Sequence, residues 1–179
     1  MPIPDRWRPV LPDPAEIERF SELCDRIENQ VEGYEQDLAT WNARASREYR
    51  EIEFRKYYGS VDKETFVTEA LLRTPAFDPQ VTFEELVAVT RAIAEGEGGE
   101  LLDEAVQSYL MEVLDVNLLG AGISDLIYWP NHWFGDEDAN PNDYELDYSQ
   151  MVRYALLRSG REVPGCPVHP ELPYPLPRP

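Results

Sequence analysis

The sequence contains few of the residues on which most enzymes and metal proteins depend. Only two cysteines, Cys24 and Cys166, and two histidines, His132 and His169, occur among 179 residues. Two cysteines so far apart form neither a disulfide framework nor a zinc pattern, and they fit a reducing cytoplasm. No glycine-rich phosphate loop follows a strand pattern, and no serine stands in a nucleophile elbow. We therefore expect no catalytic residue, no bound cofactor and no enzyme.

Positive charge is also scarce. The chain has 16 Lys+Arg against 35 Asp+Glu, which gives a formal net charge of −19. This excess disfavours direct contact with nucleic acid or with an anionic membrane. No stretch approaches the roughly 18 apolar residues of a transmembrane helix, and the N-terminus lacks the apolar run of a signal peptide. We expect a cytoplasmic protein. Its acidic surface favours a basic protein partner, although acidity in general more often serves solubility alone.

Strand patterns are missing as well, whereas apolar residues recur at helical spacing through most of the chain. From Ile17 to Ala45 they alternate in steps of three and four, which predicts one long amphipathic helix or two antiparallel helices. A charged helix is expected over residues 46–58, and Asp62 is expected to cap another. The turn-rich span 74–79 predicts a boundary between subdomains.

The second half carries the clearer helix signals. Thr82 and Glu85 have the spacing of a capping box, which predicts a helix as far as Ala94. Later helices are expected over residues 100–118 and 147–159. We predict an all-α protein whose second half is an acidic four-helix bundle with a short third helix. The expected segments are a Pro-rich arm at 1–14, a helical extension at 15–80, the bundle at 81–160 and a Pro-rich tail at 161–179.

The stretch from Gly122 to Pro130 predicts that short helix. Ser124 or Asp125 is expected to cap it, and Pro130 is expected to end it. Its adjacent aromatic residues, Tyr128 and Trp129, have two equally good readings from the pattern alone. They fill the core, or they serve as anchors of a protein interface.

An acidic segment after this helix partly resembles a calcium-binding loop. Asp136, Asp138, Asn140 and Asn142 alternate like the opening of such a loop. However, Pro141 stands where the loop needs glycine, and Asp147 stands where it needs a bidentate glutamate. A solvated acidic loop is the better interpretation, and we predict no metal site.

Residues 81–160 resemble the colicin- and pyocin-type nuclease immunity family. These small acidic four-helix proteins protect a bacterium from its own HNH-type DNase bacteriocin. The run Ser124-Asp125-Leu126-Ile127-Tyr128-Trp129-Pro130 is close to the family's Ser-Asp-Leu-Ile-Tyr-Tyr-Pro signature on the short third helix. The order of a Thr-capped helix, an acidic second helix, the signature, an acidic run and a fourth helix is also similar.

The resemblance implies a function and a binding surface. In that family the third helix supplies shared binding energy and the second helix supplies partner specificity. The implied anchors are Asp125, Tyr128 and Pro130, with Ser124 beside them and Trp129 in place of the family's second tyrosine. The implied specificity face holds Asp103, Glu104, Glu112 and Asp115. We therefore expect an antitoxin that binds and inhibits a cognate nuclease toxin, most simply a DNase.

Parts of the chain depart from the family pattern. Residues 119–122 replace the family's His-Pro loop, and neither residues 1–80 nor the tail have a counterpart in it. An acidic helical adaptor unrelated to toxins is the alternative function, since the apolar stripe and the Pro-rich tail could each bind a partner. The third hypothesis is an enzyme that depends on His132 or on the carboxylates of residues 136–143.

Overall fold

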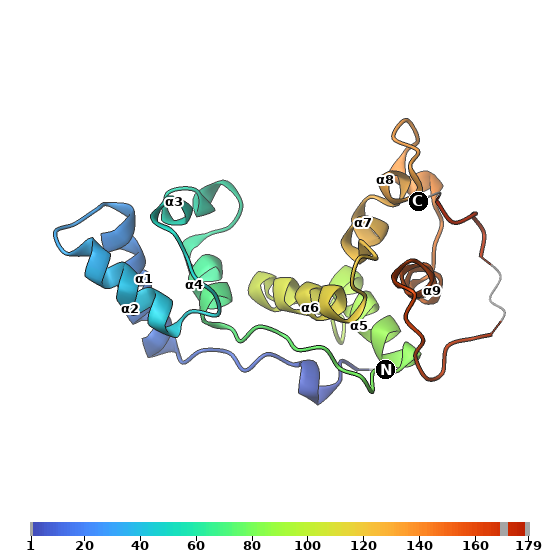
Figure 1. Ribbon diagram of the computed structural model, residues 1–179, viewed down its shortest axis with the longest axis horizontal. Helices are drawn as coiled ribbons and strands as arrows, with labels where there is room; N and C mark the ends of the chain where they lie inside the picture. The colour runs from blue at the N-terminus through green and yellow to red at the C-terminus, as the bar shows by residue number, and fades with distance from the viewer. Residues whose placement is uncertain (1, 169–171, 178–179) are drawn as a thin grey trace. The chain divides into compact units, whose positions relative to one another are not determined.

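The computed structural model describes residues 2–168 and 172–177, and in these residues the regular structure is helical, with no strand (Figure 1). An isolated bridge between Glu97 and Glu100 closes a turn. The prediction of an all-α chain is confirmed. No helix of the described residues is long and apolar enough to cross a membrane. His169 and part of the Pro-rich tail lie outside the described residues.

The chain forms two compact units. The N-terminal unit comprises residues 9–74 and 103–109, and the C-terminal unit comprises residues 2–8, 75–102 and 110 onward. The division after Thr74 falls inside the turn-rich span in which the sequence predicts a boundary. The assignment of residues 2–8 to the C-terminal unit was not expected from the sequence.

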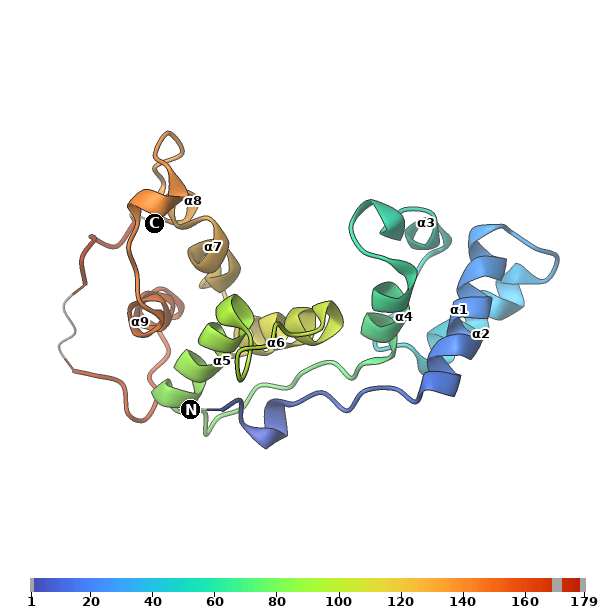
Figure 2. The same ribbon diagram turned by 180° about the vertical axis from the view of Figure 1, so that it is seen from behind.

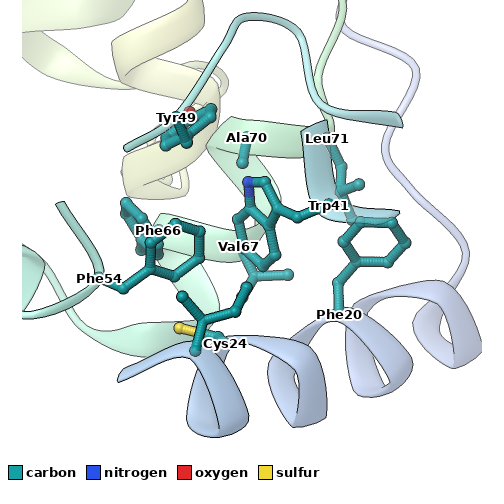
Figure 3. Close-up of a cluster of buried hydrophobic side chains, with 10 residues drawn as sticks. Phe20, Cys24, Trp41, Tyr49, Phe54, Phe66, Val67, Ala70 and Leu71 are labelled. Atoms are coloured by element: carbon teal, nitrogen blue, oxygen red, sulfur yellow. The ribbon is translucent and has the colours of Figure 1, made fainter. Parts of the chain in front are cut away.

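The N-terminal unit is a small helical domain around a cluster of aromatic rings (Figure 3). The ring of Trp41 is fully buried, and its centroid lies 5.4 Å from that of Phe20 and 4.8 Å from that of Phe54. Such offset and edge-to-face contacts stabilise a core beyond the area they bury. The helices that supply this core are α1 (Pro14–Glu28), α2 (Tyr34–Arg44), α3 (Glu51–Phe54) and α4 (Lys63–Leu71).

The apolar stripe of the sequence forms two helices, α1 and α2, rather than one. The break contains Gln30 with a φ of 49° and Gly33 with a φ of 88°, and Gly33 is the N-cap of α2. Left-handed backbone cannot continue a right-handed helix. Arg26 on α1 donates to Asp37 on α2 at 2.7 Å, which ties the two helices together. The stripe therefore packs within the chain.

The prediction of a charged helix over residues 46–58 is wrong. The helix α2 ends at Arg44, and only α3 and a 3-10 turn, η2 (Tyr57–Gly59), follow before α4. The side chain of Asn42 accepts from the Tyr49 N–H at 2.8 Å and donates to the Tyr49 carbonyl at 2.9 Å. The Ser46 N–H donates to the Ala70 carbonyl at 2.7 Å. These contacts satisfy backbone groups that a continuing helix would otherwise use.

The C-terminal unit contains most of the predicted second-half helices (Figure 2). The capping box at Thr82 and Glu85 is confirmed, with hydrogen bonds of 3.3 and 2.9 Å. The second helix begins at Glu104 rather than Glu100, because positive-φ glycines at 98 and 99 form a turn first. The helices of this half are α5 (Phe83–Glu95), α6 (Glu104–Asn117), α7 (Ile123–Tyr128), α8 (Pro130–Phe134) and α9 (Tyr148–Ser159).

Residues 2–8 of the N-terminal arm are part of the C-terminal unit. They form a short 3-10 helix, η1 (Asp5–Trp7), and the side chains of Ile3 and Trp7 are buried. Between them, Arg6 donates both terminal nitrogens to the Glu85 carboxylate, at 2.7 and 2.8 Å. Arg6 Nε donates to Asp78 at 2.8 Å. The arm therefore covers the capping box that begins α5.

Arg161 connects three further segments of this unit. Its guanidinium donates to the backbone carbonyl of Asn117 at 2.6 Å and to the Asn117 side chain at 2.9 Å. It also donates to the Asp78 carbonyl, and it lies over the ring of Phe77. The end of α6, the segment before α5 and the segment after α9 are thus joined by one side chain.

Candidate partner-binding site

The helix α7 carries the signature residues. Its N-cap is Gly122, in the left-handed conformation with a φ of 61°, and no side chain caps the helix. The prediction that Ser124 or Asp125 caps it is therefore wrong, because both residues lie inside the first turn. Gly122 suits this junction because it adopts positive φ without the steric cost of a Cβ.

Pro130 ends α7 as expected and also begins a helix that the sequence analysis missed. Trp129 is shared as the C-cap of α7 and the N-cap of α8, and its ψ of 56° is not helical. Pro130 occupies the first position of α8, where a missing N–H costs nothing. Its side chain is buried, so it contributes to the shape of the backbone at this corner and not to the exposed surface.

The two aromatic residues of the signature reach the surface. The side chain of Tyr128 is 45% exposed and that of Trp129 is 56% exposed, whereas Ile123 and Leu126 on the same helix are fully buried. Helical geometry explains this, because Ile123 and Leu126 are three positions apart and share the inner face. Of the two readings that the sequence left open, exposure favours the interface anchor. Asp125 is exposed on the same short helix.

Two further carboxylates of the expected surface lie on the second half of α6. Glu112 and Asp115 are both exposed. Partial burial among neighbouring atoms and the negative charge of Asp125 raise the pKa of Asp115. Asp115 and Asp125 are therefore close enough to repel each other. Among the described residues Asp115 and Asp125 form no ion pair.

The remaining expected residues belong to the N-terminal unit. Asp103 accepts a hydrogen bond from the Ala105 N–H at 3.0 Å, so its side chain caps the start of α6. Glu104 accepts from the Thr65 hydroxyl at 3.5 Å. The structure thus groups Asp115 with Asp125 inside one unit, and it gives Asp103 and Glu104 contacts inside the other.

The sequence analysis missed the residues that support α7 from behind. Trp133 on α8 is buried, and its indole N–H donates to the Ala121 carbonyl at 2.7 Å. A Cβ built on Gly122 would lie 3.7 Å from the Trp133 ring, so this ring packs directly against the start of α7. Arg158 of α9 lies over the same ring, 4.9 Å from its centroid. The sequence does contain a signal for this support, because Trp133 stands three residues after Pro130, a proline that can begin a helix.

The remaining groups of chemical interest are the acidic loop and the Cys24 thiol. No group of three or more His, Cys, Asp or Glu side chains within them comes together in a way that could hold a metal ion. In the acidic loop, Asn140 caps a 3-10 turn, η3 (Pro141–Asp143), and Asp136 accepts from the Tyr144 hydroxyl at 3.4 Å. Burial raises the pKa of the Cys24 thiol to about 12, so it stays protonated and unreactive in the core.

Comparison with protein-family models, with curated proteins and with solved structures found no match for this chain. The features that bear on function are therefore the signature, its exposure and the charges around it.

Proposed function

We propose that this chain is an immunity protein that binds and inhibits a cognate nuclease toxin, with a DNase as the expected class. The exposure of the Tyr128–Trp129 pair on α7 is the observation that carries the proposal. Partly exposed aromatic rings with a polar end supply large contact area at low entropic cost, and they dominate binding energy at protein interfaces.

The surrounding charge supports a basic partner. Asp125 lies on the same helix as the aromatic pair, and Asp115 lies close to Asp125. Two close carboxylates that lack a cation gain more from an incoming lysine or arginine than a carboxylate that is already paired. A DNase presents such cations, because the surface that grips DNA must be positively charged. The net charge of −19 would also speed the encounter.

The order of the helices along the second half of the chain is compatible with this family resemblance. In the proposal, α5, α6, α7 and α9 correspond to the four helices of an immunity-type bundle. The helix α7, with six residues, takes the place of the short third helix. The helix α8 is an addition, and Pro130 at its start shapes the corner rather than touching the partner. Inhibition follows from charge and bulk beside the nuclease active site, which keep DNA away from it.

The proposal is tested by capture followed by a nuclease assay. The full chain, immobilised, is exposed to lysate of its own cell, and the captured protein is separated and assayed on plasmid DNA. We expect a basic protein that cleaves DNA, and we expect one equivalent of the chain to suppress the cleavage. The double variant Tyr128→Ala, Trp129→Ala serves as matched bait and should capture far less. A captured protein without nuclease activity, or activity that survives excess chain, would refute the proposal.

A further inference from the structure

Within residues 172–177 of the tail, Tyr174 contacts the helix α9 through its backbone. Its backbone N–H donates to the Tyr154 hydroxyl at 2.8 Å, and the same hydroxyl donates to the Tyr174 carbonyl at 2.5 Å. Burial raises the pKa of Tyr154, so its hydroxyl stays protonated and keeps this donor. One side chain of α9 thus holds both backbone groups of a tail residue, as a strand partner would.

The side chain of Tyr174 makes a second set of contacts. Its hydroxyl accepts from the Glu145 N–H at 3.3 Å and donates to the Asp143 carbonyl at 3.2 Å. Its ring lies 4.9 Å from the ring of Tyr144 and 5.4 Å from the ring of Phe134, measured between centroids. The hydroxyl therefore contacts the acidic loop, whereas the ring packs against α8.

From Phe134 the contacts continue to α7. The Phe134 ring lies 4.9 Å from that of Trp133 in an edge-to-face arrangement. Trp133 donates to the Ala121 carbonyl and packs against Gly122, the N-cap of α7. These residues all belong to the C-terminal unit. A continuous path of packed rings therefore runs from the tail to the start of the helix that carries Tyr128 and Trp129.

We propose that Tyr174 is a positioning residue for the α7 anchor, acting through Phe134 and Trp133. The tail then functions as an intramolecular strap, and the exposed aromatic pair is held ready for its partner before binding. Holding an interface in its bound geometry improves affinity by reducing the ordering that association requires. The role in binding rests on the proposed function, but the positioning itself is a property of the free protein.

Amide hydrogen exchange on the free full-length chain tests the positioning without any partner. Tyr174→Ala removes the ring and the hydroxyl, and we expect exchange over residues 121–135 to rise by about tenfold or more, because local opening becomes easier. Exchange in α5 and in the N-terminal unit should stay unchanged. Tyr154→Phe, which releases the tail backbone, should reproduce this pattern.

Two further variants separate the contacts of Tyr174. Tyr174→Phe keeps the ring but loses the hydroxyl, so faster exchange should be confined to residues 143–147. Leu176→Ala alters a half-exposed tail residue and should leave exchange as in the parent. Unchanged exchange over residues 121–135 in Tyr174→Ala would overturn the proposal. So would a uniform rise across the whole C-terminal unit, since that would indicate general destabilisation instead of positioning.

Binding to the nuclease captured above supplies the second readout. If Tyr174 positions the anchor, Tyr174→Ala should weaken binding by about tenfold and Tyr174→Phe should restore most of it. If the captured protein is no nuclease, the proposed function fails while the exchange result stands. Equal binding by Tyr174→Ala and the parent would overturn the role of the strap in partner binding.

Discussion

The carboxylate of Asp115 on α6 is subject to the negative charge of Asp125 on α7, and this charge, after partial burial, raises the pKa of Asp115. Like charges placed close together destabilise the free protein. A surface that keeps such a pair gives up some stability of its own. The same pair offers a favourable position to a partner's cation, so stability and binding should respond in opposite directions when it is altered.

Asp115→Asn should therefore stabilise the free protein and slow its association. Loss of the repulsion should raise the free energy of unfolding by about 0.5 kcal/mol, as measured by urea denaturation. The association rate with the captured nuclease should fall by about threefold to tenfold, and the dependence of that rate on salt should flatten. Because the pKa of Asp115 is raised, protonation at low pH relieves the same repulsion. The stability difference should disappear as the pH falls towards the ordinary value of 3.8 and below.

The matched control is Glu22→Gln. Glu22 is an exposed carboxylate of α1, and its removal changes the net charge of the chain by the same amount. Its association rate should stay near that of the parent. An equal slowing in both variants would mean that total charge, and not the pair on α6 and α7, steers the encounter.

Truncation of the aromatic pair should separate binding from folding. Tyr128→Ala or Trp129→Ala should each weaken binding by about 2 kcal/mol or more, because interface energy is concentrated in such anchors. The free energy of unfolding should change little, since both side chains reach solvent. Calorimetric titration against the captured nuclease and thermal unfolding measure the two quantities. Tyr58→Ala, at an aromatic residue of the N-terminal unit that is 70% exposed, is the control and should leave binding intact.

The arm contact predicts an acid-dependent loss of stability. Hydrogen bonding to Arg6 is the main cause that lowers the pKa of Glu85 from 4.5 to about 2. A carboxylate with a lowered pKa stabilises the fold above its unfolded value, and this contribution is lost as the pH falls through the folded value. The parent should therefore lose stability progressively from about pH 4.5 towards about pH 2. Circular dichroism of urea unfolding at several pH values measures this slope.

Glu85→Gln isolates that contribution. Glutamine at the third helical position still completes a capping box with Thr82, so α5 keeps its start. The ion pair with Arg6 is lost, and the variant should show a shallower decline over the same pH range. An identical decline in parent and variant would show that other carboxylates are responsible for the acid response.

Arg161→Lys should destabilise the C-terminal unit although the charge is kept. Lysine lacks the planar fork that reaches Asn117 and the Asp78 carbonyl together, so partly buried acceptors lose their donors. We expect a loss of about 2–3 kcal/mol in the free energy of unfolding. Arg73→Lys, at an exposed position of the N-terminal unit, should be neutral. A neutral Arg161→Lys would contradict the role of Arg161 as a connector.

Local signals in the sequence identified the helices whose ends are determined by neighbouring residues. Thr82 with Glu85 begins α5, and Asp62 begins α4 by accepting from the Thr65 N–H. Gly160, with a φ of 69°, ends α9. Each of these ends depends on contacts within a few residues, which is why spacing alone predicts them.

Distant contacts explain what the sequence analysis did not anticipate. The chain leaves helical geometry after α2 because Asn42 pairs with the Tyr49 backbone and Ser46 pairs with Ala70. No local pattern within residues 46–58 predicts that the helix ends there. The surface expected on α6 is divided because Asp103 and Glu104 belong to the N-terminal unit, where Glu104 accepts from the Thr65 hydroxyl 39 positions away. The stretch from Gly122 to Pro130, in contrast, predicted a short helix that Pro130 ends, and α7 is that helix.

The docked arm has a consequence for the order in which the chain can acquire its structure. Arg8 contacts Glu97, which lies 89 positions later in the sequence, and Ile3 contacts the same carboxylate across 94 positions. During synthesis the arm leaves the ribosome long before these partners exist. Residues 9–74, which carry the helices α1 to α4, lie between the arm and Glu97 in the chain. Their contacts close shorter loops than the contacts of the arm do, and shorter loops cost less conformational entropy. The arm is thus made well before it can reach its native contacts.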